Sequence, residues 1–459
     1  MRLLSLCLTC VFLFSAYKQN RPAPEVIEDP VDYYSQDDME KDFGDDTLTD
    51  EQADGDLSIW SYTDEFSIIV DEYINAHPDS NINPDYTIYG TDRYQEQLEI
   101  ALTGVWDDCP DIFVIESSYA YDYIKGEFSE YCLPYKDLGI DVDAKAKDAQ
   151  ISQYLLESGS NINGDIVAMS YQSDAGLIFY RRSIAKEVWG FDDEQSVRNK
   201  IGGLSGGWDD FMNASKELHD KGYCMFSSMD DMWNIVEDSG YEPWVDAFGN
   251  KCINTEREEY LDLAKEMINN NYVHPDEYSW TGEWFDGMRK DSDVFAYAGP
   301  EWFLDYVLIP NAEETSGDWG ACLPPYGFYW GGSYIFVNKD LDDSKKAAVR
   351  DLLEWATLDC TENGLQYKIC NGEIEYFSEG ACVPSEKVML NSVRNKEFLN
   401  GQEVNSMFAI ASNIAYADSF GLNDEYFAAM WKDYANRYAK GEIDKETVIS
   451  EMLSCLEGY

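Results

Sequence analysis

Histidine and basic side chains are scarce in this sequence. Its 459 residues include three widely separated histidines, and 33 Lys and Arg against 89 Asp and Glu, for a formal net charge of −56. Nucleic-acid recognition through a basic face requires clustered Lys and Arg, so this composition excludes it as the main function. Scattered histidines also argue against a multi-histidine metal site, and we expect neither a metal nor a cofactor.

Motifs of several enzyme classes are missing as well. The sequence contains no GxxxxGK[ST] phosphate-binding loop, so any ATPase would have to be a partner protein. Residues 203–207 match the nucleophile-elbow pattern, but that motif needs a strand before it, and Arg198, Asn199 and Lys200 precede it instead. We therefore predict a glycine-rich loop here and a protein that is not an enzyme.

No CxxC pair occurs among the nine cysteines that follow Cys10, so the usual spacing of zinc and redox sites is absent there. Two interpretations of these cysteines remain. Buried free thiols are favoured, but Cys360, Cys370 and Cys382 are close enough in sequence to form a disulfide if the compartment is oxidising.

The N-terminus carries the pattern of an export signal. The apolar run at residues 3–14 has the length of a signal-peptide core and is too short to span a bilayer. It leads towards what looks like a bacterial lipoprotein cleavage site, but Tyr17 stands where the lipid-bearing cysteine would be, so lipid attachment stays open. We predict a signal peptide at residues 1–16 and an acidic, disordered tether at residues 17–56, which has too few apolar side chains to offset its ordering entropy.

Strand and helix patterns alternate from residue 57 onward. The chain is 44% hydrophobic and 15% aromatic, which predicts a large folded core. Residues 64–76 place Phe66, Ile69 and Val70 on one helical face. In residues 111–115, the four that follow Asp111 form a continuous apolar run, typical of a strand buried on both faces. Such alternation predicts the α/β class.

Six short motifs follow one another in a recognisable order. They are Trp60, Pro110–Phe113, Met169–Arg181, Gly207–Phe211, Gly299–Trp302 and Trp330–Gly332. Over roughly residues 57–459 this order resembles that of the family 1 extracellular solute-binding proteins, the sugar-capturing subunits of bacterial ABC importers. The resemblance implies a two-lobed, periplasmic-binding-protein-like α/β fold of type II, with a ligand cleft between the lobes and three inter-lobe crossings.

The motifs allow the lobes to be mapped onto the chain. We expect one lobe from residues 57–172 and 298–327, and the other from residues 173–297 and 328–459. The three crossings are expected near residues 170–176, 295–299 and 326–331.

Aromatic side chains are the first candidates for a sugar site, because a pyranose ring presents an apolar face that stacks on flat plates. Trp302 and Trp330 follow short strands and adjoin glycines, so they are expected at strand ends, where open α/β sheets bind ligands. Packing between the lobes is the alternative for both. We include Trp60 with Gly331 and Gly332 in the predicted site, and the irregularly placed Trp233, Trp244, Trp280 and Trp284 receive no role.

Polar partners for sugar hydroxyls are expected at the same strand ends. A carboxylate that accepts two hydroxyls forms charge-assisted bonds and discriminates strongly between sugars. Asp64 could equally cap a helix, Glu301 could be a rim charge, and the remaining carboxylates could simply be solvated. The predicted polar residues are Asp64, Glu116, Ser118, Tyr171, Asp174 and Glu301.

These observations lead to one functional prediction with two alternatives. We expect an extracytoplasmic protein at a bacterial cell surface that captures a carbohydrate, preferentially a neutral oligosaccharide, and delivers it to the membrane permease subunits of an ABC importer. A monomer without affinity for nucleic acid is expected. The alternatives are an extracellular carbohydrate-active hydrolase and a polysaccharide-adhesion protein.

Overall fold

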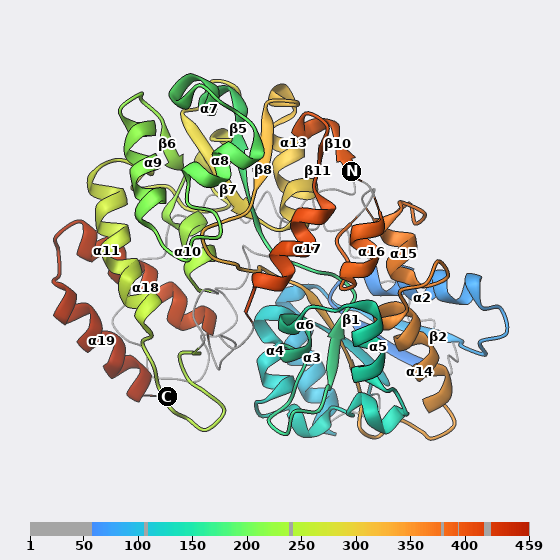
Figure 1. Cartoon of the computed structure of the whole chain (residues 1–459). Helices are drawn as coiled ribbons and strands as arrows, with labels where there is room; N and C mark the ends of the chain where they lie inside the picture. Colours follow the sequence, from blue (N-terminus) through green and yellow to red (C-terminus); the bar gives the residue numbers. More distant parts are fainter. Residues whose placement is uncertain are drawn as a thin grey trace, which may run out of the picture.

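A computed structural model describes residues 57–104, 109–237, 242–377, 381–392, 394–416 and 424–458. Two lobes lie side by side, each built on its own sheet (Figure 1). The predicted signal peptide and acidic tether lie outside the described residues. Within the described ranges, no helix has both the length and the apolar character needed to cross a bilayer.

Lobe 1 is built on a five-stranded sheet with the order β2-β1-β3-β9-β4. Strands β1 and β2, and β1 and β3, pair in parallel, whereas β9 runs antiparallel to both β3 and β4. The sheet is therefore mixed. Its strands are β1 (Leu57–Ser61), β2 (Pro84–Ile88), β3 (Ile112–Glu116), β4 (Ala168–Ser170) and β9 (Ser333–Val337).

The apolar run of β3 is buried on both faces, as predicted. Ile112 and Val114 pack into the core on one face of the sheet, and Phe113 and Ile115 pack into a second core on the other face. This division follows from the two-residue period of a strand. Phe113 stacks on Phe336 of the adjacent β9 with ring centroids 5.4 Å apart, which ties the antiparallel strand to the parallel ones.

Lobe 2 is built on a four-stranded sheet with the order β6-β7-β5-β8. Strands β6 and β7 are parallel, and β5 is antiparallel to its neighbours β7 and β8. The strands are β5 (Leu177–Arg181), β6 (Cys224–Phe226), β7 (Val294–Gly299) and β8 (Trp319–Cys322).

Helices cover both sheets, and α17 lies between the lobes (Figure 1). In lobe 1 they are α2 (Glu65–Ala76), α3 (Thr91–Leu102), α4 (Ser117–Ile124), α5 (Val142–Ala149), α6 (Gln153–Glu157), α14 (Lys346–Leu353), α15 (Leu365–Cys370) and α16 (Glu386–Asn391). The other α-helices are α7 (Arg182–Trp189), α8 (Glu194–Lys200), α9 (Asp209–His219), α10 (Met229–Glu237), α11 (Thr255–Asn269), α12 (Gly282–Asp286), α13 (Ile309–Asn311), α17 (Asn405–Ile414), α18 (Asp424–Ala439) and α19 (Lys445–Glu457). Short 3₁₀ or π turns are η2 (Ser129–Tyr131), η3 (Tyr135–Leu138), η4 (Phe303–Leu308), η5 (Glu313–Thr315), η6 (Glu354–Leu358) and η7 (Glu397–Leu399).

The strand pairing corrects the predicted lobe boundaries. Strand β8, within residues 298–327, was expected in lobe 1 but pairs with β5 of lobe 2, and β9, within residues 328–459, pairs with β3 of lobe 1. Both predictions were wrong because an apolar run shows that a segment is a buried strand, but not which sheet it joins. Pairing partners distant in sequence decide that.

One of the three predicted crossings is also corrected. The chain does cross between β4 and β5 and between β8 and β9, near the predicted residues 170–176 and 326–331. Residues 295–299, however, belong to β7 in the middle of the lobe 2 sheet. The third crossing follows α16 of lobe 1. After it, Gln402 lies against β8 of lobe 2, and the side-chain amide nitrogen of Gln402 donates to the Ala321 carbonyl at 2.7 Å.

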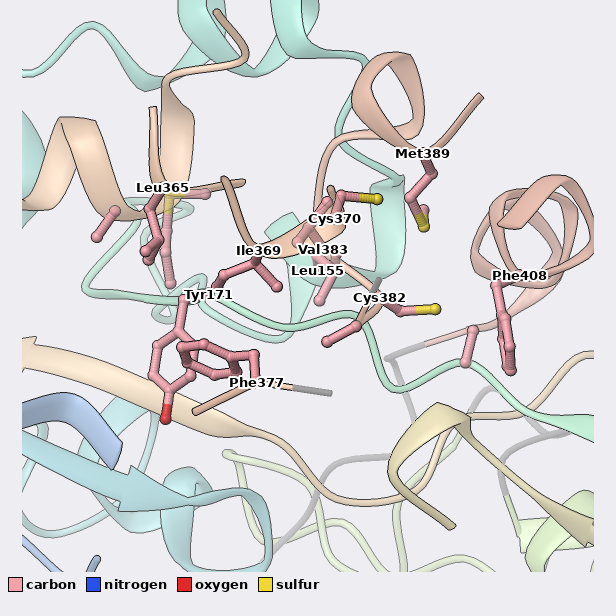
Figure 2. Packing of buried hydrophobic residues seen from close by; sticks show 14 of the residues in the cluster. Leu155, Tyr171, Leu365, Ile369, Cys370, Phe377, Cys382, Val383, Met389 and Phe408 are labelled. Atoms are coloured by element: carbon pink, nitrogen blue, oxygen red, sulfur yellow. The ribbon is translucent and has the colours of Figure 1, made fainter. Parts of the chain in front are cut away.

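The lobes share a hydrophobic core across the crossings. Leu155 of α6, Ile369 of α15, Met389 of α16 and Phe408 of α17 belong to one cluster, which also includes Tyr171 after β4 (Figure 2). The same core continues under the lobe 2 sheet. Cys370 and Cys382 lie in this cluster, and no disulfide joins any of the nine cysteines within the described residues.

A substitution at Gly176, in the first crossing, tests this packing. An added Cβ at Gly176 would lie 2.0 Å from the Phe328 ring, which is fully buried. We expect Gly176→Ala to destabilise the fold by about 1–3 kcal/mol through overpacking. Gly207→Ala is the control, because a Cβ there meets nothing within 4 Å. Thermal unfolding followed by circular dichroism should show a lower Tm for Gly176→Ala alone, and equal Tm values would contradict the packing.

Candidate functional site

Strand ends of the two sheets face each other where the chain crosses between the lobes. In lobe 1, Glu116 at the end of β3 pairs with Ser333 at the start of β9. In lobe 2, Gly299 at the end of β7 pairs with Leu177 at the start of β5. The residues directly after Glu116 and Gly299, and directly before Ser333 and Leu177, therefore lie at the junction between the lobes. This junction is our candidate site.

Three tryptophans cluster at this junction. The rings of Trp302 and Trp330 have centroids 4.9 Å apart, and Trp280 lies 6.4 Å from Trp302 and 5.8 Å from Trp330. The Trp302 indole donates to the Trp330 carbonyl at 2.9 Å. All three side chains are half-buried, so each retains surface that faces solvent.

Trp280 was missed by the sequence analysis, which gave it no role. It lies in an irregular segment, and its backbone φ is +71°, a left-handed conformation that is costly for a residue with a Cβ. Such strain tends to gather at functional sites. No local pattern separates it from the other loop tryptophans, because its proximity to Trp302 depends on the folded path of the chain.

Gly331 and Gly332 connect the tryptophans to the polar part of the site. Both have left-handed backbones, with φ of +88° and +117°. A Cβ on Gly332 would lie 2.8 Å from Asp174 Oδ2, so only glycine allows the carboxylate to approach this closely. The Gly332 carbonyl also accepts from the Ser117 amide at 2.9 Å.

Asp174 is the most buried carboxylate of the predicted set. The residue is 5% exposed, and its carboxylate oxygens keep a small accessible surface instead of being sealed in the core. Its main chain is fixed, because the Asp174 amide donates to the Tyr154 hydroxyl at 3.1 Å and its carbonyl accepts from the Trp330 amide at 3.0 Å. The carboxylate is therefore held in place while its own hydrogen-bonding capacity remains open.

Glu65 and Tyr62 are site residues that the sequence analysis missed. Tyr171, which was predicted, donates its hydroxyl to Glu65 Oε2 at 2.6 Å, and Gln172 donates to Glu65 Oε1 at 3.1 Å. The Tyr62 hydroxyl lies 2.5 Å from Ser333 Oγ. Glu65 adjoins Asp64 in sequence, so the pattern located this helix start but named the exposed acid and not the one that Tyr171 and Gln172 contact.

Burial and mutual repulsion raise the pKa values of these acids. Burial raises the pKa of Asp174 well above its ordinary value, and the charges of Glu65, Glu301 and Glu116 add to the shift. Burial also raises the pKa of Glu65 from 4.5 to about 7, although the Tyr171 hydrogen bond opposes this. Burial raises the pKa of Glu116, opposed by hydrogen bonds from Ser118 and Ser117.

Two of the predicted acids have local structural roles. Glu116 caps α4, with its carboxylate accepting from the Ser118 amide at 3.1 Å and from the hydroxyls of Ser117 and Ser118, rather than being simply solvated. Asp64 is exposed at the start of α2, makes no side-chain cap, and accepts from the Tyr376 hydroxyl at 3.2 Å.

Glu301 is neither an open ligand acceptor nor a rim charge. Its carboxylate accepts from Arg394 at 3.1 Å, and the same guanidinium reaches Asp305 at 2.6 Å, with all three side chains at most 8% exposed. Burial and the charge of Asp305 raise the pKa of Glu301 to about 8. The group supports the start of η4 next to Trp302.

Trp60 is corrected from ligand plate to core residue. It is 1% exposed and packs edge-on against Tyr89 with ring centroids 5.4 Å apart. The prediction was wrong because alternation along β1 turns Trp60 to the helix-covered face of the sheet, while the site lies beyond the strand's end.

Comparisons with known proteins identify a related family. The family model described as bacterial extracellular solute-binding protein matches residues 60–359, which is more than half of the chain. No curated protein sequence matches.

Solved structures share the fold at low sequence identity. An extracellular solute-binding protein of family 1 has a TM-score of 0.73 at 18% identity, covering 88% of this chain and 98% of that chain. The sugar-binding protein MalE from Xanthomonas citri has a TM-score of 0.64 at 12% identity, covering 88% and 96%. The galacto-N-biose-/lacto-N-biose I-binding protein of the ABC transporter from Bifidobacterium longum, in complex with lacto-N-biose, has a TM-score of 0.59 at 16% identity, covering 86% and 94%.

The raised carboxyl pKa values predict how stability depends on pH. A carboxyl whose pKa is raised by folding holds its proton more tightly in the folded state, so stability falls as pH rises from the ordinary value through the folded value. For Glu65 that window runs from 4.5 to about 7. We expect a higher Tm at pH 5 than at pH 8, and Glu65→Gln should reduce this difference by removing one titrating group.

Glu373→Gln, at an exposed position of lobe 1, is the matched control and should leave the pH dependence as in the parent protein. Differential scanning calorimetry across this range measures both effects. A Tm that rises from pH 5 to pH 8 would contradict the burial of protonated carboxyls at the junction.

Proposed function

Because the chain belongs to family 1 of the bacterial extracellular solute-binding proteins, we propose that it captures a neutral oligosaccharide at the junction of its lobes and delivers it to the permease subunits of an ABC importer. The solved relatives named above include sugar-binding proteins of the same fold. Proteins of this family bind solutes outside the cytoplasm.

The open carboxylate of Asp174 is the observation that carries the proposal. Its oxygens keep accessible surface at an otherwise buried position, so a ligand that enters the junction can replace the water on them. Sugar hydroxyls can donate to this carboxylate, and a protonated carboxyl could donate in return to a ring or hydroxyl oxygen. Asp174 thus provides an acceptor at a fixed position beside Gly332.

The half-buried tryptophans supply the apolar half of such a site. Trp280, Trp302 and Trp330 are held at fixed angles by one another, so little conformational entropy is lost when a pyranose face packs on them. Aromatic plates beside hydrogen-bonding groups match the two kinds of surface that a sugar presents. This combination favours a carbohydrate over an inorganic ion or a peptide.

Truncation of one tryptophan tests the stacking. A ligand is first selected from a panel of neutral oligosaccharides by the change in tryptophan fluorescence. We then expect Trp330→Ala to weaken its binding by roughly 1–3 kcal/mol, the scale of lost aromatic burial, in isothermal titration calorimetry.

Trp189→Ala is the control for the tryptophan variant. This half-buried residue packs against Phe295 within lobe 2 and away from the junction, with ring centroids 5.3 Å apart. Its truncation should lower Tm without changing affinity. Unchanged affinity in Trp330→Ala would place the sugar elsewhere.

Removal of the Asp174 carboxyl group tests the polar contact. We expect Asp174→Ala to weaken sugar binding by about 1–3 kcal/mol, the range for a polar group left without its hydrogen-bond partner. Asp64→Ala, at the exposed start of α2, is the matched control and should bind like the parent protein. Equal affinities for both variants would remove Asp174 from the site.

The alternatives are separated by the fate of the sugar. When the protein is incubated with labelled oligosaccharides, a binding protein returns them intact, whereas a hydrolase shortens them. An adhesion protein would retain polysaccharide without stimulating uptake through the importer. Recovery of shortened products would overturn the proposal.

A further inference from the structure

A cluster of three potential metal ligands lies at the starts of β6 and β7, at the end of the lobe 2 sheet opposite the junction. It consists of Cys224, His274 and Asp293. Cys224 opens β6 and Asp293 directly precedes β7, and these two strands are parallel neighbours. The Cys224 amide donates to the Asp293 carbonyl at 2.9 Å, which sets the two side chains side by side. His274 comes from the segment after α11, where its amide donates to the Ser227 carbonyl at 3.1 Å.

Each of the three side chains contributes one potential ligand atom to a common metal site. The thiol sulfur, an imidazole nitrogen and a carboxylate oxygen all lie within 4.8 Å of one another. His274 Nε2 is 3.0 Å from Asp293 Oδ1. Ligand atoms around a tetrahedral ion with bonds of about 2.0–2.3 Å are separated by comparable distances, so small side-chain movements would complete the site.

A fourth position is available beside this cluster. Water, not Glu277, would fill this position, because Glu277 faces the other imidazole nitrogen: its Oε1 lies 3.8 Å from His274 Nδ1, and its other carboxylate oxygen accepts from Ser227 Oγ at 2.7 Å. A surface hollow of about 420 Å³, lined by His274, Glu277 and Asp293 among others, gives ions and water access. Cys224 is 7% exposed, so the cluster combines a buried sulfur with an open side.

We propose that Cys224, His274 and Asp293 bind a zinc ion. Thiolate and imidazole together favour Zn²⁺ over Mg²⁺ or Ca²⁺, which prefer oxygen ligands, and three protein ligands with an open position form an ordinary zinc geometry. From the sequence we expected no metal, because the histidines are scattered and the cysteines lack zinc-site spacing. These three ligands are 50 and 19 residues apart in the chain, so no local motif reveals them.

The zinc site is independent of the sugar site. Asp293 precedes β7 and Glu301 follows it, so the six residues of β7 separate the two by roughly 20 Å. A bound ion would connect β6, β7 and the segment after α11. Because an ion that binds only the folded state adds to stability, zinc should raise the Tm of the protein.

Cobalt provides the direct test on the metal-free full-length protein. We expect one Co²⁺ per chain, with visible bands of tetrahedral coordination and a near-ultraviolet charge-transfer band from the thiolate. Zn²⁺ should displace Co²⁺ and raise Tm. Cys224→Ser should abolish the charge-transfer band, and His274→Gln should weaken zinc binding by a factor on the order of 100 in competition with a chromophoric chelator.

Two control variants remove a cysteine and a histidine of the same lobe that lie outside the proposed zinc site. Cys252→Ser removes a thiol of the same lobe that lies 3.0 Å from a Glu242 oxygen, and His219→Gln removes a histidine that packs on Tyr272. Both should bind Co²⁺ like the parent protein. If Cys224→Ser does not fold, as judged by circular dichroism, Asp293→Asn takes its place and should weaken binding similarly.

Two results would overturn the proposal. In the first, no charge-transfer band forms in the parent protein, which would leave the three residues as a hydrogen-bonded group. In the second, the band persists in Cys224→Ser, or Asp293→Asn binds Co²⁺ as tightly as the parent protein, which would place the ion on other residues. Sugar affinity should not change in any of these variants, so failure here is distinguishable from failure of the proposed function.

Discussion

Two of the three segments that cross between the lobes are hydrogen-bonded to each other, and the candidate site depends on this pairing. The Trp330 amide donates to the Asp174 carbonyl at 3.0 Å, and the Gly176 amide donates to the Phe328 carbonyl at 2.9 Å. These bonds fix Asp174 and Trp330 on neighbouring backbones. Without them, the acid and the aromatic plate would belong to separate crossings with no fixed relation.

Glycine makes the pairing compatible with a ligand site. Gly331 and Gly332 both take left-handed backbones directly after Trp330, so the chain turns sharply into β9. The turn leaves room for the Asp174 carboxylate beside Gly332 and for the Trp302 ring beside Gly331. Sequence, backbone conformation and site geometry are therefore linked within a few residues.

Local pattern was sufficient for some elements and insufficient for others. The two-face burial of β3 and the meeting of Trp302 with Trp330 could be predicted, because strand period and glycine-flanked strand ends are local signals. The sheet that β8 joins, the role of Trp280 and the choice of Glu65 over Asp64 could not, since each depends on contacts between segments distant in sequence. Glu301 shows the same limit, because its partner Arg394 is 93 residues away.

The most direct test is a crystal structure of the protein with the oligosaccharide selected by fluorescence. Our account predicts a pyranose ring stacked on at least one of Trp280, Trp302 and Trp330, with sugar hydroxyls within hydrogen-bond distance of Asp174. A sugar bound away from the lobe junction, or one that contacts neither the tryptophans nor Asp174, would contradict it.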